Sequence, residues 1–231
     1  MTPTPWIYSF EEENWIEKKT DNPPLGQYGH YMIYAESTDQ LLMYPGHWNI
    51  YSDGELQSHG FGGNLWEYDV FNNTWITHYS SYHPPGRYWG NMVYDSTEGR
   101  IIFFGGHGTV NYDDTWIYKI TEREWEKIEQ VEKPSKRSGF SLCYDPENHV
   151  VVLFGGFSDD RQSIGDTWIL DCETLTWYQP EANEPEKSNS EDVNENMTIP
   201  GFPLLTASLG IIIFYLIRAH SSNARGISVP R

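Results

Sequence analysis

The chain has 231 residues, of which 33 are acidic and 15 are lysine or arginine, so its formal net charge is −18. All acidic residues lie before residue 197, where 12 basic residues stand against 33 acidic ones and the net charge is −21. A surface of that charge repels phosphate, so the composition excludes nucleic acid as a favoured partner. Aromatic residues make up 16% of the chain and supply ample core material, whereas two cysteines are too few for a disulfide scaffold.

The chain opens with half of a repeating unit and continues with three complete units. The half unit covers residues 5–17, and the full units cover about 26–78, 86–128 and 136–178. Each contains two tryptophans that are nine residues apart: Trp6 and Trp15, Trp66 and Trp75, Trp116 and Trp125, and Trp168 and Trp177. A self-similar period of about 50 residues is typical of repeat folds.

Each full unit shows the pattern of four short strands. The runs IIFF at 101–104 and VVLF at 151–154 are continuously apolar, as expected for a strand that is covered on both faces. A glycine pair follows each run, where we expect a positive φ or a close approach to the next unit. In the segments 114–120 and 166–172 the apolar residues alternate, which predicts half-buried strands. The predicted fold class is therefore all-β.

At these residues the chain resembles the kelch family of β-propellers. The shared features are the apolar tetrad, the double glycine and the aromatic pair that follows, here Trp116 with Trp125 and Trp168 with Trp177. The resemblance covers about residues 5–180 and implies four-stranded propeller blades. It implies little about activity, because propellers carry many unrelated functions. The first full unit departs from the pattern, with Pro45-Gly46 in place of the glycine pair.

Three and a half blades are fewer than the roughly four to eight blades of closed propellers. Two explanations stay open. Either further strands precede the sequence given, or another chain, such as a second copy in a homodimer, completes the ring. We favour the first explanation, because the sequence starts inside a broken unit.

The C-terminal part predicts a membrane anchor. Residues 181–198 are rich in acids and poor in apolar side chains, which is typical of a disordered stalk. The segment 199–217 has 19 residues without a charge, and as a transmembrane helix it would span about 28 Å, close to a bilayer core. Arginines occur in the tail at 218–231, so the positive-inside rule places this tail in the cytoplasm and the blades outside. A tail-anchored cytoplasmic scaffold is the alternative, because residues 1–13 lack the basic region, the apolar region and the cleavage site of a secretory signal.

Two short motifs agree with a surface location. Pro200-Gly201-Phe202 lies at the start of the uncharged segment and resembles the Pro-Gly-Phe anchoring signal of archaeal surface proteins, which implies an archaeal origin. The triplets that begin at Asn72 and Asn196 fit the N-glycosylation pattern, which matters only on an extracytoplasmic face.

Kelch-like propellers generally bind through loops at one end of the ring, which on this chain correspond to 47–63, 107–114 and 157–166. The first is the longest and carries aromatic side chains suited to a protein or carbohydrate ligand. The alternative is that Trp48 and Phe61 fold back over the base of their own loop. From these loops the candidate ligand-binding residues are His47, Trp48, Tyr51, His59, Phe61, His107, Tyr112 and Arg161.

Arg87 and Arg137 open equivalent first strands and complete the candidate set. They could present cations to a ligand carboxylate. On this acidic surface we favour the alternative, in which each arginine pairs with a carboxylate of the adjacent blade. Asp114 and Asp166 precede Thr-Trp in two units, where turns between side chain and backbone explain an aspartate.

We expect no metal site and no cofactor. His47 and His107 share a column of the repeat, but the third unit has Phe157 there and no further ligand follows at a fixed spacing. The sequence lacks the His-Glu-x-x-His, Gly-x-Ser-x-Gly and phosphate-loop motifs. Cys143 and Cys172 occupy core columns, so we expect both to be small buried residues, and whether they pair stays open.

The expected function is that of a membrane-anchored cell-surface module that binds a protein or glycan without catalysis. One alternative is part of a propeller enzyme, an oxidase or hydrolase, whose catalytic residues lie on blades outside this sequence. The other is the cytoplasmic scaffold described above.

Overall fold

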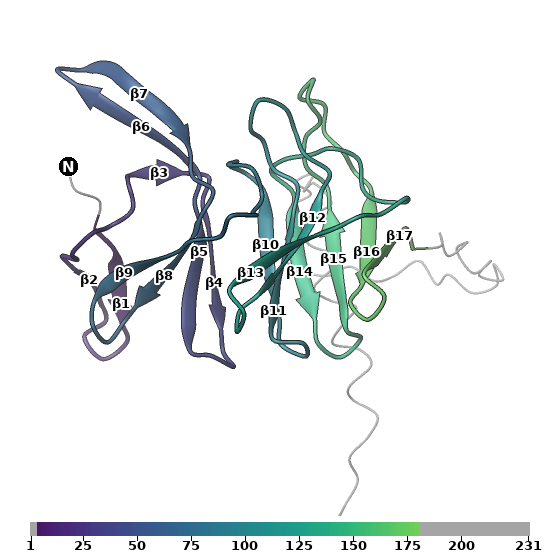
Figure 1. Ribbon diagram of the computed structural model, residues 1–231, viewed down its shortest axis with the longest axis horizontal. Coiled ribbons are helices and arrows are strands. Elements are labelled where there is room, and N and C mark those ends of the chain that lie inside the picture. The colour runs from purple at the N-terminus through teal and green to yellow at the C-terminus, as the bar shows by residue number, and fades with distance from the viewer. Residues whose placement is uncertain (1–3, 181–231) are drawn as a thin grey trace, which may run out of the picture. The chain divides into compact units, whose positions relative to one another are not determined.

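A computed structural model describes residues 4–180 and shows an all-β fold, as the sequence predicts (Figure 1). Within this range no helix is long and apolar enough to cross a membrane. The expected stalk at 181–198, transmembrane segment at 199–217 and tail at 218–231 lie outside the described residues.

The described strands form five antiparallel sheets, three of which have four strands. The first sheet contains β4 (Tyr31–Ala35), β5 (Gln40–Tyr44), β8 (Leu65–Asp69) and β9 (Thr74–His78). The second contains β10 (Asn91–Asp95), β11 (Arg100–Phe104), β12 (Thr115–Lys119) and β13 (Glu124–Ile128). The third contains β14 (Ser141–Asp145), β15 (Val150–Phe154), β16 (Thr167–Asp171) and β17 (Thr176–Tyr178). A two-stranded sheet, β1 (Trp6–Ser9) and β2 (Asn14–Glu17), precedes them along the chain.

In the second and third sheets, an aspartate carboxylate stabilises the tight turn between the first two strands. At the end of β10 the Asp95 carboxylate accepts hydrogen bonds from two backbone amides of the turn, and the turn ends at Gly99 with a φ of +66°. Asp145 does the same at the end of β14, where His149 has a φ of +53°. Side-chain to backbone bonds of this kind favour a turn over continued strand, and the left-handed residue brings the chain back into register.

The segment expected to be a long loop, 47–63, instead forms a β-hairpin. It consists of β6 (His47–Ser52) and β7 (Glu55–Phe61), and β6 also pairs with the short β3 (Gln27–Tyr28). The hairpin turns at Asp53-Gly54, where both residues have positive φ values of 53° and 81°. Asp-Gly suits the two-residue hairpin turn, which needs two left-handed residues. The hairpin extends beyond the end of the first sheet (Figure 1).

The second tryptophan of each later pair packs its sheet onto the preceding one. Trp125 of β13 lies 6.0 Å, centroid to centroid, from Tyr44 of the first sheet. Trp177 of β17 lies 5.3 Å from Phe104 of the second sheet and donates a 2.9 Å hydrogen bond from Nε1 to the Thr115 hydroxyl. Tyr44 and Trp125 belong to an apolar core between the first and second sheets. Phe104 and Trp177 belong to a second apolar core between the second and third sheets.

Trp75, the second tryptophan of the first sheet, faces an apolar groove. The groove has a volume of about 580 Å³ and lies between β1 and the first sheet, with Trp6, Met32 and Met43 also in its wall. The Trp75 Nε1 atom is buried and has no hydrogen-bond partner in the range 4–180.

The glycine pairs occur where the chain needs left-handed backbone, as expected. Gly105 and Gly106 have φ values of 58° and 102°, and the Gly106 amide donates a 2.9 Å hydrogen bond to the Arg137 carbonyl in the segment that leads to the third sheet. A Cβ atom on Gly106 would lie 2.7 Å from the Gly90 backbone nitrogen. Only glycine fits both the conformation and the space.

The two cysteines are free thiols. Cys172 is buried, as expected, but the expectation of burial was wrong for Cys143, which is exposed. Cys143 lies on β14 of the third sheet, whose side chains alternate between more and less exposed positions, and it borders an open hollow that residues of β4 and β10 also line.

Candidate functional site

Aromatic side chains gather at the end of the sheets where the β6–β7 hairpin lies. They come from β3, from the hairpin, from the segment before β10 and from the loop after β11. Neighbouring rings have centroids between 4.6 and 5.8 Å apart. We call this set the aromatic band: Tyr28, His47, His59, Phe61, Tyr88, Trp89 and His107.

Tyr88 is at the centre of the aromatic band. Its ring centroid lies 4.6 Å from that of Trp89, 5.5 Å from that of His107 and 5.6 Å from that of Tyr28. Phe61 stacks on it at 5.8 Å with an interplanar angle of 10°. Burial raises the pKa of the Tyr88 phenol. The hairpin and the second sheet are therefore joined by ring packing around a neutral tyrosine.

Trp89 has a backbone conformation that bulky residues rarely adopt. Its φ is +55°, whereas the equivalent positions in the first and third sheets are Gly29 and Gly139, both with a φ of +66°. The Trp89 amide donates to the Gly29 carbonyl at 3.1 Å, and the Gly139 amide donates to the Trp89 carbonyl at 2.8 Å. All three residues that take part in these bonds between sheets have the left-handed conformation. A tryptophan here carries strain of about 1–2 kcal/mol that a glycine would not.

The Trp89 side chain is 47% exposed despite its size. It borders a pocket of about 550 Å³ between the second and third sheets. Phe157, which is 48% exposed, lies in the wall on the third sheet. The polar side chains of the pocket include His107, Asp159 and Arg161. Aromatic walls with a few polar groups are the usual composition of a small-ligand site.

Asn111 fixes the polar side of this pocket. It is 2% exposed, its side-chain amide donates to the Phe157 carbonyl at 2.9 Å, and its backbone amide donates to the Asp159 carboxylate at 2.6 Å. Because a carbonyl only accepts, the Asn111 side-chain oxygen must face the other way, toward His107 Nδ1 at 2.8 Å. His107 therefore carries its proton on Nδ1, and Nε2 keeps a lone pair when the ring is neutral.

Arg161 and Asp159 bring opposite charges to the pocket. Arg161 lies at a turn with a φ of +60°, and its backbone amide donates to the Ser158 carbonyl at 3.0 Å. The Arg161 and Asp159 side chains are exposed, and in the described range neither takes part in an ion pair. Both ions are thus available to a molecule in the pocket.

His47 and His59 lie at the hairpin side of the aromatic band. Their rings are stacked with centroids 5.5 Å apart. Burial, with a smaller contribution from His59, lowers the pKa of His47. The His47 Nδ1 atom is buried without a hydrogen-bond partner in the range 4–180. The predicted residues His47, His59, Phe61 and His107 are therefore brought together, although they do not share one loop.

The other predicted hairpin residues lie apart from the pocket. A Cβ atom on Gly60 would lie 2.6 Å from the Trp48 indole, so Trp48 covers the backbone of its own hairpin. The alternative interpretation expected this of Trp48 and Phe61, but Phe61 stacks on Tyr88 instead. Tyr51 lies near the hairpin turn and is 62% exposed.

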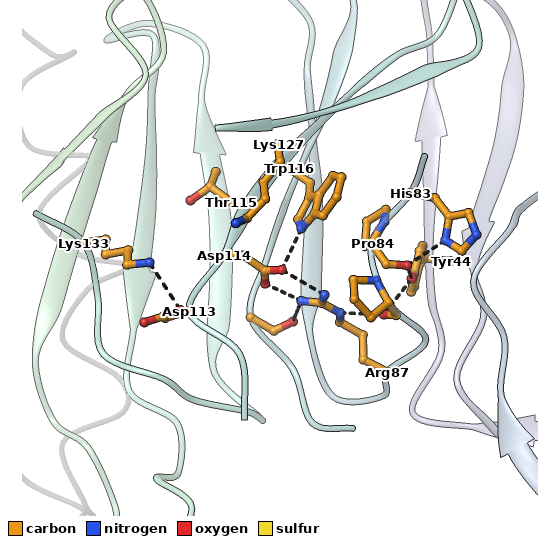
Figure 2. Close-up of polar contacts among 12 residues, drawn as sticks. Tyr44, His83, Pro84, Arg87, Asp113, Asp114, Thr115, Trp116, Lys127 and Lys133 are labelled. Carbon is orange, nitrogen blue, oxygen red and sulfur yellow. Dashed lines mark hydrogen bonds and ion pairs between the residues drawn. The ribbon is translucent and has the colours of Figure 1, made fainter. Parts of the chain in front are cut away.

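Arg87 and Arg137 do not face solvent, which corrects their assignment as ligand-binding cations. Both side chains are 0% exposed, because each guanidinium ion-pairs with an aspartate, Asp114 or Asp166. Figure 2 shows Arg87 held by the Asp114 carboxylate and by two backbone carbonyls, while Trp116 donates to the same carboxylate from Nε1 at 2.7 Å. Each ion pair lies within one repeat, in the segments that lead into its strands, and not between adjacent blades as the favoured alternative supposed.

Tyr112 packs against Arg87. The guanidinium carbon of Arg87 lies 3.8 Å from the Tyr112 ring centroid, which is the geometry of a cation–π contact. Tyr112 thus covers the buried ion pair.

One group of potential metal ligands occurs in the range 4–180: Asp95, His149 and Cys172, with donor atoms within 4.8 Å of one another. The Asp95 carboxylate is already bound by Arg100 at 3.0 Å and by His149 at 3.3 Å. Burial raises the pKa of the Cys172 thiol to about 12, so it is not a thiolate at neutral pH. We assign this group to the contact between the second and third sheets.

Sequence reasoning missed Tyr88, Trp89, Asn111 and Asp159. A signal for Trp89 was present, since its repeat equivalents are Gly29 and Gly139, and a tryptophan in a glycine column marks an unusual position. No comparable signal identifies Asn111, because its partners Phe157 and Asp159 lie in another repeat.

Comparison with known proteins gives partial similarities. No family model matches the chain. It is 33% identical over 85 residues to dynein regulatory complex subunit 7 of Chlamydomonas reinhardtii, covering 35% of this chain. It is 37% identical over 82 residues to an F-box/kelch-repeat protein of Arabidopsis thaliana, covering 33% of this chain. It is 22% identical over 185 residues, 73% of this chain, to Mei4-dependent protein 6 of Schizosaccharomyces pombe.

These matches cover 7%, 17% and 26% of the three relatives, so the chain corresponds to a small part of each. The kelch-repeat relative and the antiparallel sheets of the described range agree with kelch-type repeats in this chain.

Proposed function

We propose that residues 4–180 form part of a kelch-type β-propeller. Three four-stranded sheets follow one another along the chain, and each later sheet packs on the preceding one through the second tryptophan of its pair. The second and third repeats each contain a buried arginine that ion-pairs with an aspartate, and in each the aspartate also accepts a hydrogen bond from a tryptophan Nε1. The partial similarity to a kelch-repeat protein supports the same proposal.

We further propose that the end of the sheets that carries the aromatic band binds a protein or glycan ligand without catalysis. The observation that carries this proposal is Trp89, a half-exposed tryptophan in a strained conformation beside a 550 Å³ pocket. Strain of this kind persists where the side chain is needed, because glycine would relieve it. Tyr51 and Phe157 add exposed aromatic surface at the same end.

A retention experiment with immobilised full-length protein tests this function. The triple variant Tyr51→Ala, Trp89→Gly, Phe157→Ala removes the exposed aromatic surface of this end. The matched variant Phe10→Ala, Phe71→Ala removes two aromatic side chains that are 89% and 91% exposed at turns of the opposite end. We expect glycans or proteins released from source cells to be retained by the wild type and the matched variant but not by the triple variant. Equal retention by all three proteins would contradict the proposal.

We also propose that the uncharged segment 199–217 anchors the protein in a membrane, with the propeller on the cell surface. Its 19 residues and the arginines that follow support this topology. Protease added to intact cells should then digest residues 4–180 and leave a tag at the C-terminus protected. Protection of both parts in intact cells would instead indicate a cytoplasmic scaffold.

A further inference from the structure

The pocket beside Trp89 combines a flat apolar surface with polar groups of both kinds. The indole is one wall, Phe157 contributes another, and His107, Asp159 and Arg161 supply the polar atoms. We propose that this pocket binds a pyranose ring of a neutral glycan, with the ring stacked on the Trp89 indole and its hydroxyl groups hydrogen-bonded to His107, Asp159 and Arg161. The proposal rests on the ligand-binding function proposed above and narrows the ligand to a carbohydrate.

The Trp89 indole is held in place as a rigid platform. Its backbone is fixed by the two hydrogen bonds to Gly29 and Gly139, and its ring packs against Tyr88 with centroids 4.6 Å apart. A Cβ atom on Gly29 would lie 3.0 Å from the indole Cδ1 atom, so the absence of a side chain at Gly29 makes room for the indole. A platform that does not reorient loses little conformational entropy when a ring stacks on it.

The polar groups match vicinal hydroxyls, each of which both donates and accepts a hydrogen bond. His107 Nε2 accepts, because Nδ1 is committed to Asn111. Asp159 accepts through its carboxylate, one oxygen of which is steadied by the Asn111 amide at 2.6 Å. The Arg161 guanidinium donates. Two neighbouring hydroxyls can therefore donate to the Asp159 carboxylate and accept from the Arg161 guanidinium at the same time. Hydrogen bonds to charged groups such as these are stronger than those between neutral groups.

Charge favours a neutral ligand over a charged one. The Asp159 and Arg161 charges offset each other within the pocket, so a ligand of either sign meets one group that repels it. The part of the chain before residue 197 carries a net charge of −21, which further disfavours an acidic peptide or an acidic sugar. A neutral pyranose can stack its C–H face on the aromatic wall and form hydrogen bonds to the polar groups through its hydroxyls.

Saturation-transfer NMR with the full-length protein tests the proposal. The probes are mannotriose, cellotriose and chitotriose, each at millimolar concentration. We expect at least one to receive saturation, and Trp89→Gly to weaken its binding by about two- to tenfold, since an aromatic stacking contact contributes about 0.5–1.5 kcal/mol. Asp159→Asn should weaken binding as well, whereas Phe71→Ala at the opposite end should not. Trp89→Gly is expected to fold, because glycine occupies both equivalent positions.

The outcomes separate this inference from the broader function. Saturation that persists unchanged in Trp89→Gly would overturn the glycan site. If no saccharide binds and the retention experiment still shows a protein lost from the triple variant, the ligand is a protein and the glycan inference is wrong while the binding function stands. If nothing is lost in the triple variant, both proposals fail.

Discussion

Replacing Arg87 by methionine is expected to lower the free energy of unfolding by about 3–5 kcal/mol, because it leaves the buried Asp114 charge without its partner. The Asp114 carboxylate is only 12% exposed, and Arg87 is 0% exposed, so water cannot take over the lost contact. Two backbone carbonyls, those of Pro85 and Gly105, would also lose their hydrogen-bond donor. Urea titration followed by circular dichroism measures the loss.

Two further variants make this test specific. Lys119→Met breaks the exposed ion pair with Glu126, whose side chains are 49% and 54% exposed, and should cost about 1 kcal/mol or less. The double variant Arg87→Met, Asp114→Leu removes both charges and should recover part of the stability, because no unpaired charge remains. If Arg87→Met costs no more than Lys119→Met, the buried pair does not contribute as proposed.

The same pair predicts a dependence on acid. Burial raises the pKa of Asp114, but the hydrogen bonds and charge of Arg87, with the Trp116 donor, outweigh it, and the pKa in the folded protein is lowered. A lowered carboxyl pKa stabilises the fold above the unfolded value of about 4, and this stabilisation is lost as pH falls through the folded pKa. The loss of stability on acidification should be smaller in the Arg87→Met, Asp114→Leu variant, which lacks this carboxylate.

Trp125→Ala is expected to cost about 3–5 kcal/mol, as is usual for a large aromatic side chain removed from a core. Trp125 is 5% exposed and packs between Tyr118 of its own sheet and Tyr44 of the first sheet, at centroid distances of 4.9 and 6.0 Å. The substitution removes contacts within the second sheet and between two sheets at once. Thermal unfolding followed by calorimetry provides the comparison.

Trp15→Ala is the matched control, because Trp15 has the same place in the repeat but is 58% exposed. Its cost should stay below about 1 kcal/mol. Comparable losses in the two variants would mean that the tryptophan spacing stabilises each strand pair locally and that packing between sheets contributes little.

The strands could be predicted because their signals are local. The apolar run at 101–104 becomes β11, and the alternation after Asp114 becomes β12, in register with each other from Phe104 opposite Thr115 to Arg100 opposite Lys119. The hairpin at 47–61 was predicted as a loop, although Asp53-Gly54 is a strong hairpin signal. Its flanking residues include histidines, serines and a glycine, which obscured the strand pattern.

The candidate site was harder to predict because its contacts join residues that are far apart in the sequence. Arg87 pairs with Asp114 of its own repeat, 27 residues along the chain, whereas the sequence favoured a carboxylate of the adjacent blade. Asn111 acts on Phe157 and Asp159, which are 46 and 48 residues away. Residues that carry a sharp local pattern were placed correctly, whereas those whose role depends on a partner distant in the sequence were not.

The tryptophan packing gives the stack of sheets a direction. Each second tryptophan points to the preceding sheet, so Trp75 of the first sheet faces the groove that β1 also lines, whereas the third sheet has Phe154 and Tyr178 exposed at 42% and 43%. Two like ends cannot reproduce the contact between sheets; only unlike ends can. Copies of this chain that reused the contact would therefore associate head to tail, and such an assembly forms a ring if the rotation closes and an open filament if it does not.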